Sequence, residues 1–200
     1  MMKTIEFWFD FTSPYSYLAA TRIDDLAAKH GRTVTWHPFL LGAIFQKTGG
    51  QPPLDVPLKG DYSRRDFARS ARFLGVPFRF PARFPLPTQA AARAFYWLDA
   101  QFPTLAKPFA QAMFTALFVE GRDISAPEVV LDLAAGLGIE REALSAALAS
   151  PPLKAQLVAV NQAALDKGIF GAPFVIIDGE PFWGADRLPQ IEQWLTTGGF

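Results

Sequence analysis

The sequence of 200 residues contains no cysteine. The chain therefore has no disulfide bond, no thiolate ligand for a metal and no cysteine nucleophile. Histidine is scarce as well, and the two that are present, His30 and His37, have no partners at a metal-binding or catalytic spacing. No nucleophile elbow, phosphate-binding loop or dinucleotide-binding glycine motif is present. We therefore expect no metal site.

Net charge of either sign is also absent, because 19 basic residues balance 19 acidic ones. Nucleic acids and anionic membranes are therefore not expected as partners. No uncharged run reaches the roughly 18 residues of a membrane-spanning helix. The start, MMKTIEFWFDF, carries Glu6 and Asp10 in its apolar run and lacks the pattern of a cleaved signal peptide. With half of its residues hydrophobic, the chain is expected to be a compact cytoplasmic protein.

The first 40 residues read as strand, helix, strand. Apolar residues alternate from Ile5 to Phe11, which is the period of a strand, and helical spacing follows from Tyr15 to a stop at His30-Gly31. Residues 33–40 form a second strand, in which Pro38 favours an edge position. A strand-helix-strand unit of this length is parallel and right-handed.

The middle of the chain is helical. Residues 42–58 are rich in glycine and proline and are predicted to be a loop. Alanine-rich segments with helical spacing then follow, and prolines stand near several of their starts. The predicted helices cover roughly 60–75, 88–101, 104–120, 126–138, 140–149 and 152–168.

The end of the chain returns to strands. Residues 173–183 are two short apolar runs joined by Asp178-Gly179, a strong hairpin signal, and a helix follows. This order predicts an α/β protein with a thioredoxin-like fold interrupted by a large all-helical insertion. The thioredoxin-like domain would comprise residues 1–41 and 169–200, and the helical insertion domain residues 42–168.

In a thioredoxin-type redox protein, the helix after the first strand starts with Cys-x-x-Cys, whereas this chain has Ser13 and Ser16 at those positions. A thiol-disulfide oxidoreductase is thereby excluded. Ser13 before Pro14 is a typical helix cap, and from the motif alone capping is favoured over catalysis by about two to one. The alternative is that its hydroxyl and the helix N-terminus stabilise a thiolate that a ligand brings.

Two further stretches fit a peptide-like ligand with a thiol. Ala172, before Pro173, would pair its backbone with an extended peptide if that peptide bond is cis, although a proline there can simply open a strand. Asp186 in FWGADRL caps the last helix or binds an ammonium group, with even odds, while nearby N–H groups bind a carboxylate. A tripeptide with such a zwitterionic end and a central thiol is glutathione.

At these residues the chain resembles 2-hydroxychromene-2-carboxylate isomerases and, more distantly, kappa-class glutathione transferases, which are DsbA-like members of the thioredoxin superfamily. The matching stretches cover nearly the full length and occur in the same order. They are FWFDFTSPYSYLAA, FLLGAIFQKTGGQPP, KGDYSRRD, FGAPFVI and FWGADRL. The family's fold agrees with the one predicted here, and its members are usually dimers, which implies a homodimer.

The resemblance implies a role for each matching residue. Ser13 would be the catalytic serine that holds the glutathione thiol or thiolate, and Ala172, with a cis Pro173, would pair with the glutathione backbone. Lys59 would face carboxylates of the ligand. The γ-glutamyl end would be held by Trp183, Gly184, Ala185 and Asp186. Gly50 and Pro87 depart from the pattern, because family members usually have asparagine at both positions, and these changes concern the substrate pocket.

The reaction implied by the resemblance is the reversible conversion of 2-hydroxychromene-2-carboxylate, an aromatic carboxylate, into trans-o-hydroxybenzylidenepyruvate in aromatic catabolism. Glutathione would be the cofactor, because addition of its thiolate to the conjugated double bond leaves a single bond that can rotate. Two alternatives remain open from the sequence. One is a kappa-like glutathione S-transferase, and the other is a non-catalytic ligand-binding member of the fold.

Overall fold

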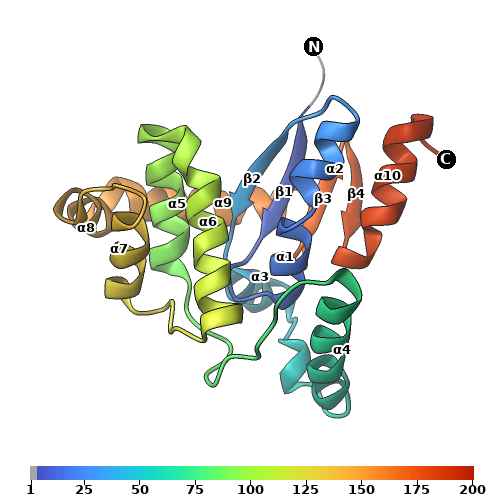
Figure 1. Ribbon diagram of the computed structural model, residues 1–200, viewed down its shortest axis with the longest axis horizontal. Coiled ribbons are helices and arrows are strands. Elements are labelled where there is room, and N and C mark those ends of the chain that lie inside the picture. The colour runs from blue at the N-terminus through green and yellow to red at the C-terminus, as the bar shows by residue number, and fades with distance from the viewer. Residues whose placement is uncertain (1–3) are drawn as a thin grey trace.

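Four strands form one mixed sheet at the centre of the molecule, in the order β2-β1-β3-β4 (Figure 1). The structure is a computed structural model that describes residues 4–200, so the first three residues of the predicted domain and of the N-terminal stretch lie outside the described residues. The strands are β1 (Ile5–Phe9), β2 (Val34–Pro38), β3 (Phe174–Ile177) and β4 (Glu180–Trp183). β1 is parallel to β2 and antiparallel to β3. The predicted parallel unit and the edge position of the strand containing Pro38 are both confirmed.

The terminal hairpin is also confirmed. β3 and β4 pair antiparallel and are joined by Asp178 and Gly179, whose φ angles are 54° and 98°. Positive φ at both central residues is what a tight two-residue hairpin turn requires, and it explains the Asp-Gly pair. The hairpin places Trp183 opposite Phe174, so the residues after β4 lie beside the segment that enters β3.

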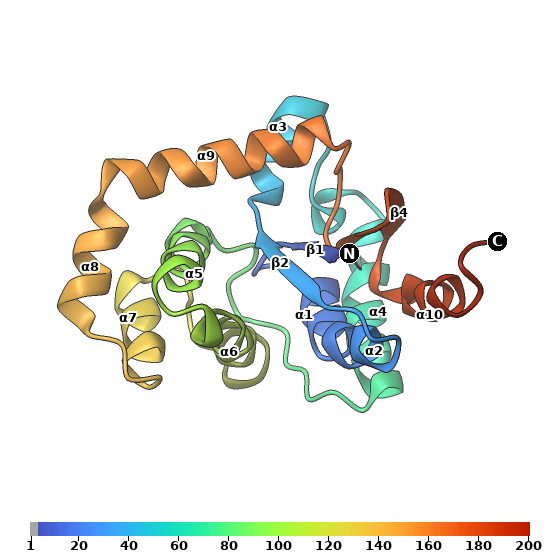
Figure 2. The same ribbon diagram turned by 90° about the horizontal axis from the view of Figure 1, so that it is seen from above.

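Both faces of β1 are buried, as its nearly continuous apolar sequence requires. Phe7 and Phe9 share a core with Leu18 of α1 (Pro14–Ala20) and Phe114 of α6 (Pro103–Thr115), and the centroids of the Phe9 and Phe114 rings are 5.6 Å apart. On the opposite face Trp8 packs with Ile44 of α3 (Leu41–Thr48) and with α9 (Pro151–Asp166). Figure 2 shows α1 and α2 (Ile23–Lys29) on one side of the sheet and α3 and α9 on the other. Each buried phenylalanine contributes about 1.5–3 kcal/mol by leaving water.

The helices between β2 and β3 form the predicted insertion. The further elements of this region are η1 (Pro53–Asp55), α4 (Lys59–Leu74), α5 (Gln89–Gln101), α6 (Pro103–Thr115), the π-helical turn η2 (Ala116–Glu120), α7 (Pro127–Ala135) and α8 (Arg141–Ala149). Of the helices in this region, α5 to α8 lie beside the edge strand β2, α4 lies against α1, and α9 crosses back to the sheet (Figure 2). All six predicted helices are present, with ends within a few residues of those expected. After β4 the chain ends with η3 (Ala185–Arg187) and α10 (Leu188–Thr197).

Two predictions of local structure were wrong. Residues 42–58 are not all loop, because α3 occupies Leu41–Thr48 and buries Ile44 completely. Its end is set by Gly49, which has a φ of 75°. The segment from Tyr15 to Lys29 is two helices rather than one, with a break at Thr21-Arg22, where the Thr21 hydroxyl donates to the Leu18 carbonyl over 2.7 Å.

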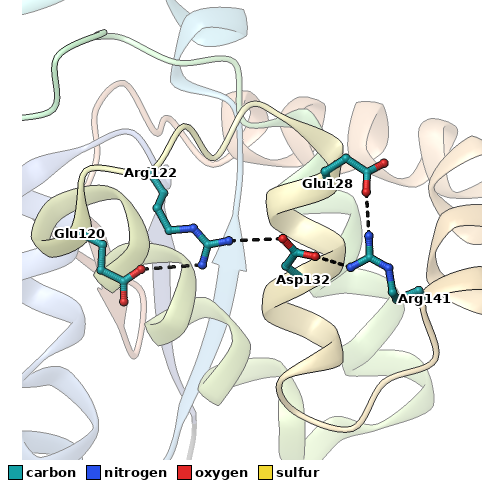
Figure 3. Close-up of polar contacts among 5 residues, drawn as sticks. All are labelled: Glu120, Arg122, Glu128, Asp132 and Arg141. Atoms are coloured by element: carbon teal, nitrogen blue, oxygen red, sulfur yellow. Dashed lines mark hydrogen bonds and ion pairs between the residues drawn. The ribbon is translucent and has the colours of Figure 1, made fainter.

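An ionic chain joins the outer helices of the insertion. Figure 3 shows Arg122 between Glu120 and Asp132, and Arg141 between Asp132 and Glu128. The Arg141–Glu128 pair is 2.7 Å long, and the two Arg122 pairs are 3.7 and 3.6 Å long. Because Asp132 pairs with both arginines, this one carboxylate connects the end of η2, α7 and the start of α8.

Within residues 4–200, no single helix is long and apolar enough to cross a membrane. Together, α8 and α9 meet the criteria of length and composition, but the two helices are bent by 64° at the break between them.

Candidate functional site

A cleft with a volume of about 1560 Å³ opens where the ends of β1 and β4 meet α3, α4 and the loop before α5. Its walls come from both the sheet and the insertion. Seven of the eight site residues predicted from the sequence line this cleft, and Pro173 is the one that does not. The seven are Ser13, Lys59, Ala172, Trp183, Gly184, Ala185 and Asp186.

Ser13 stands at the start of α1 and is buried, with 8% of its surface exposed. Its hydroxyl oxygen accepts a hydrogen bond from the Ser16 N–H over 3.1 Å, which is the expected helix cap. The same hydroxyl donates to the Ala172 carbonyl over 3.0 Å. The structure therefore confirms the cap and also brings together two predicted site residues that are 159 positions apart.

The Ala172–Pro173 peptide bond is cis. The Pro173 carbonyl accepts a hydrogen bond from the Gly184 N–H over 3.0 Å, which holds the two backbone segments side by side. The Ala172 N–H donates to no other backbone group of residues 4–200. An extended peptide could therefore pair with this N–H as an added strand.

The segment after β4 presents a ring, a turn and a carboxylate to the cleft. The Trp183 indole lies over Gly171, where an added Cβ would be 2.2 Å from the indole nitrogen. Gly184 has a φ of 112°, and its conformation suits only glycine. Asp186 does not cap α10, which has no side-chain cap, and its carboxylate pairs with Arg187 over 3.2 Å and remains 72% exposed. The capping alternative for Asp186 was therefore wrong.

Lys59 reaches the cleft from the first residue of α4, and no ion pair among residues 4–200 includes it. Gly50 and Pro87 also line the cleft. Gly50 lies against the ring of Phe45, where an added Cβ would be 2.6 Å from a ring carbon. Phe45 thus fills the space that an asparagine at position 50 would need.

Sequence reasoning missed three polar residues of the cleft, which are Asp10, Tyr15 and Asp66. Asp10, at the end of β1, is 3% exposed and accepts three hydrogen bonds. The only signal for it was an acidic residue closing an apolar strand just before Ser-Pro. Tyr15 of α1 donates from its hydroxyl to Asp66 of α4, a contact that no local pattern indicates.

The Tyr15–Asp66 contact shifts both ionisations. Burial and the hydrogen bond to Asp66 raise the pKa of the Tyr15 phenol well above its usual range. Burial alone would raise the pKa of Asp66, but the hydrogen bonds from Tyr15 and Arg69 outweigh burial and lower it. Tyr15 therefore stays protonated at neutral pH and fixes α1 to α4.

The fold is that of a thioredoxin-like domain with a helical insertion, and its cleft contains no thiol. The family model of the DSBA-like thioredoxin domain matches residues 4–196, and the chain belongs to this family. The chain is 30% identical to a 2-hydroxychromene-2-carboxylate isomerase of Sphingobium xenophagum, over 98% of this chain and 99% of that one. The family resemblance inferred from the sequence motifs is thereby confirmed.

Two other known proteins place the chain in the same group. A solved structure of a 2-hydroxychromene-2-carboxylate isomerase superposes with a TM-score of 0.86 at 29% identity, covering 97% of this chain and 95% of the other. Human glutathione S-transferase kappa 1 is 26% identical over 96% of this chain and 93% of its own length. The relatives are thus named as isomerases and transferases. The chain therefore belongs to a family that contains enzymes of both names.

Proposed function

We propose that this protein is a glutathione-dependent isomerase that interconverts 2-hydroxychromene-2-carboxylate and trans-o-hydroxybenzylidenepyruvate. The observation that carries the proposal is the contact of Ser13 with Ala172 in the cleft of a chain without cysteine. A site with this architecture but without sulfur is suited to a thiol that comes with the ligand. The isomerase relatives described above supply the substrate class.

The residues present fit glutathione. A γ-glutamyl end needs a carboxylate for its ammonium group and N–H donors for its carboxylate, and exposed Asp186 and the start of η3 offer both. A peptide backbone needs a partner such as the Ala172 N–H, which donates to no backbone group of residues 4–200. A terminal carboxylate needs a cation, and Lys59 lines the same cleft and forms no ion pair with any of residues 4–200. Trp183, Gly184 and Ala185 line the same cleft.

When bound, glutathione would supply the thiolate nucleophile for reversible addition to the substrate double bond. The chain's own part is to hold that charge and to orient the substrate. The Ser13 hydroxyl would donate to the sulfur, and a charge-assisted hydrogen bond of this kind favours the ionised form. Phe45, Leu41 and Leu86, which line the same cleft, would pack against the aromatic ring of the substrate.

The decisive experiment follows the thiol concentration during turnover. An isomerase regenerates glutathione, so the free thiol should remain constant while 2-hydroxychromene-2-carboxylate is converted. The second candidate, favoured by the kappa-class relatives, is a transferase, which would consume one thiol for each generic electrophile converted, such as 1-chloro-2,4-dinitrobenzene. Stoichiometric loss of thiol with the chromene would contradict the isomerase proposal.

Glutathione binding is tested separately by thermal unfolding. A ligand that binds only the native state raises the melting temperature, by an amount corresponding to about 2.7 kcal/mol at a hundredfold excess over Kd. No shift at millimolar glutathione would contradict both enzyme functions. A shift without either activity would leave a ligand-binding protein.

We further propose that the protein is a cytoplasmic homodimer that acts in aromatic catabolism. The family resemblance supports the dimer and the pathway, and the balanced composition without cysteine supports the compartment. Sedimentation at micromolar concentration would test the dimer directly.

A further inference from the structure

The carboxylate of Asp10 is a buried group of the cleft for which the proposed function has no use. It lies at the end of β1 and accepts hydrogen bonds from three segments. The Thr12 N–H donates to Oδ1 over 2.9 Å, and the Thr88 hydroxyl donates to the same oxygen over 3.0 Å. The Leu41 N–H donates to Oδ2 over 2.8 Å. Burial of a carboxylate costs free energy unless its oxygens accept hydrogen bonds, and these bonds restrict the position of every donor.

Two of these donors lie at the starts of helices that line the cleft. Leu41 is the first residue of α3, and residue 40 before it is a leucine that cannot cap the helix. Asp10 supplies the missing cap from β1, across 31 positions of the chain. Thr88 is the N-cap residue of α5, yet its hydroxyl makes no capping bond and points to Asp10 instead.

A second hydrogen bond also attaches the segment before α5 to the residues after β1. The Thr12 side-chain oxygen accepts a hydrogen bond from the Leu86 N–H over 3.1 Å, and Thr12 itself donates its N–H to Asp10. Loop 84–88 is thus attached to the end of β1 through both Thr12 and Thr88. It supplies Phe84, Leu86 and Pro87 to the cleft wall, and α3 supplies Leu41 and Phe45.

These two walls are apolar and include none of the residues that fit glutathione, although the Ser13 N–H donates to the Asp10 backbone carbonyl over 3.0 Å. The glutathione side comes from Ser13, Ala172, Lys59 and the segment 183–186, and none of these side chains contacts the Asp10 carboxylate through a hydrogen bond. The walls held by Asp10 therefore belong to the half of the cleft that remains for the second substrate. Their aromatic and aliphatic side chains suit a planar, apolar ring.

We propose that Asp10 is a positioning residue that sets the spacing of the α3 and 84–88 walls, and thereby the affinity for the aromatic electrophile rather than for glutathione. This inference rests on the proposed function for the identity of the two substrates. A carboxylate suits the task because both of its oxygens accept, whereas an amide would turn an N–H group toward at least one of the three donors. Asp10→Asn keeps the volume and breaks this match.

The experiment compares Asp10→Asn with Tyr96→Phe. The control removes another buried hydrogen bond, from the Tyr96 hydroxyl to the Pro38 carbonyl over 2.8 Å, at a residue outside the cleft. At saturating glutathione we expect Asp10→Asn to raise KM for the aromatic substrate about tenfold, with the Kd of glutathione within twofold of wild type. Tyr96→Phe should change neither constant, although both variants lower stability. An unchanged KM in folded Asp10→Asn, or an equal change in the Kd of glutathione, would overturn the proposal.

Two additions keep the test decisive. If Asp10→Asn does not fold, Thr88→Val is the second variant, because it removes one of the three donors to Asp10. We expect it to raise the KM of the aromatic substrate about threefold. An unchanged KM would overturn the proposal. If wild type neither binds glutathione nor turns over, the proposed function fails on its own. The affinity for the dye 1-anilinonaphthalene-8-sulfonate then reports on the apolar walls. We expect it to fall about tenfold in Asp10→Asn and to stay constant in Tyr96→Phe, and equal dye affinity in all three proteins would overturn the role of Asp10.

Discussion

The hydroxyl of Ser13 donates its only proton to the carbonyl oxygen of Ala172, over 3.0 Å. This hydroxyl cannot at the same time donate to a thiolate, so it must turn away from Ala172 when a thiolate is bound. This rotation of the hydroxyl also frees a lone pair of the Ala172 carbonyl for a peptide ligand. Under the proposed function, binding of the thiol and pairing of the peptide backbone would therefore be coupled through one proton.

Replacement of Ser13 separates its two roles. In Ser13→Ala we expect the free energy of unfolding to fall by about 2 kcal/mol, of which the cap and the bond to Ala172 each account for about half. If the hydroxyl holds the thiolate, loss of a bond worth about 1.5–3 kcal/mol raises the pKa of bound glutathione by about one to two pH units. Ultraviolet absorbance of the thiolate in a pH titration of the complex measures this pKa.

Ser16→Ala is the matched control. The Ser16 hydroxyl is fully buried in the same turn and has no hydrogen-bond partner within the described residues. Its removal should leave both the stability and the thiol pKa near the wild-type values. Equal thiol pKa values in wild type and Ser13→Ala would reduce Ser13 to a helix cap.

The contact between Phe45 and Gly50 should govern the choice of electrophile. Gly50→Ala places a methyl group where the ring of Phe45 now lies, so the ring must move. We expect the substrate KM to rise severalfold while the Kd of glutathione stays constant. In a Phe45→Ala background the same methyl group meets no ring, and its effect on KM should disappear. Additive effects of the two substitutions would show that Phe45 does not transmit the change.

The Tyr15–Asp66 hydrogen bond should stabilise the fold in a pH-dependent way. Because the pKa of Asp66 is lowered in the native state, its contribution is complete above the unfolded value of about 3.9 and is lost as the pH falls through the lower native value. Tyr15→Phe should therefore cost about 1–2 kcal/mol at pH 7 and progressively less below pH 4. Urea unfolding at a series of pH values measures this difference.

Tyr17→Phe is the control for this pH dependence. The Tyr17 hydroxyl donates to the neutral Pro77 carbonyl over 2.8 Å, so the cost of its removal should not change between pH 7 and pH 3. A cost of Tyr15→Phe that stayed constant over the same range would contradict the assignment of Asp66 as a charged acceptor.

The ionic chain of Figure 3 should depend on salt. Asp132→Asn removes two ion pairs at once, and we expect a melting temperature about 2 °C lower in dilute buffer. At 1 M salt, where screening acts over about 3 Å, the difference should vanish. Glu192→Gln removes the isolated Lys29–Glu192 pair and should have a smaller effect. A salt-independent loss would assign Asp132 a packing role instead.

Most of the fold could be predicted because local signals coincide with tertiary structure. The alternation in β1, the Asp178-Gly179 turn and the prolines at the starts of α6, α7 and α9 are all visible in the sequence. The helix α3 was missed because glycine and proline dominate the composition after it, and its cap is supplied by Asp10 from another segment. No window of sequence around Leu41 contains that cap.

The residues of the candidate site likewise fall into those that short motifs indicate and those that only long-range contacts reveal. Ser13, Ala172 and Asp186 could be selected because each belongs to a short motif with a known physical role. The bonds of Asp10 to Leu41 and Thr88 span 31 and 78 positions, and the bond of Tyr15 to Asp66 spans 51. Such pairings depend on how the insertion folds back onto the sheet, and a single sequence does not encode them as a pattern.

The placement of the insertion between β2 and β3 has an evolutionary consequence. The sheet and the segments that flank it supply Ser13, Ala172 and Asp186 to the cleft, while the inserted helices and loops supply Phe45, Leu86 and also Lys59. Under the proposed function, mutations in the inserted part other than at Lys59 would therefore change which electrophile is accepted and leave Ser13, Ala172 and Asp186 in place. One ancestral scaffold could in this way diversify into enzymes for new aromatic compounds through drift in a single, contiguous stretch of its gene.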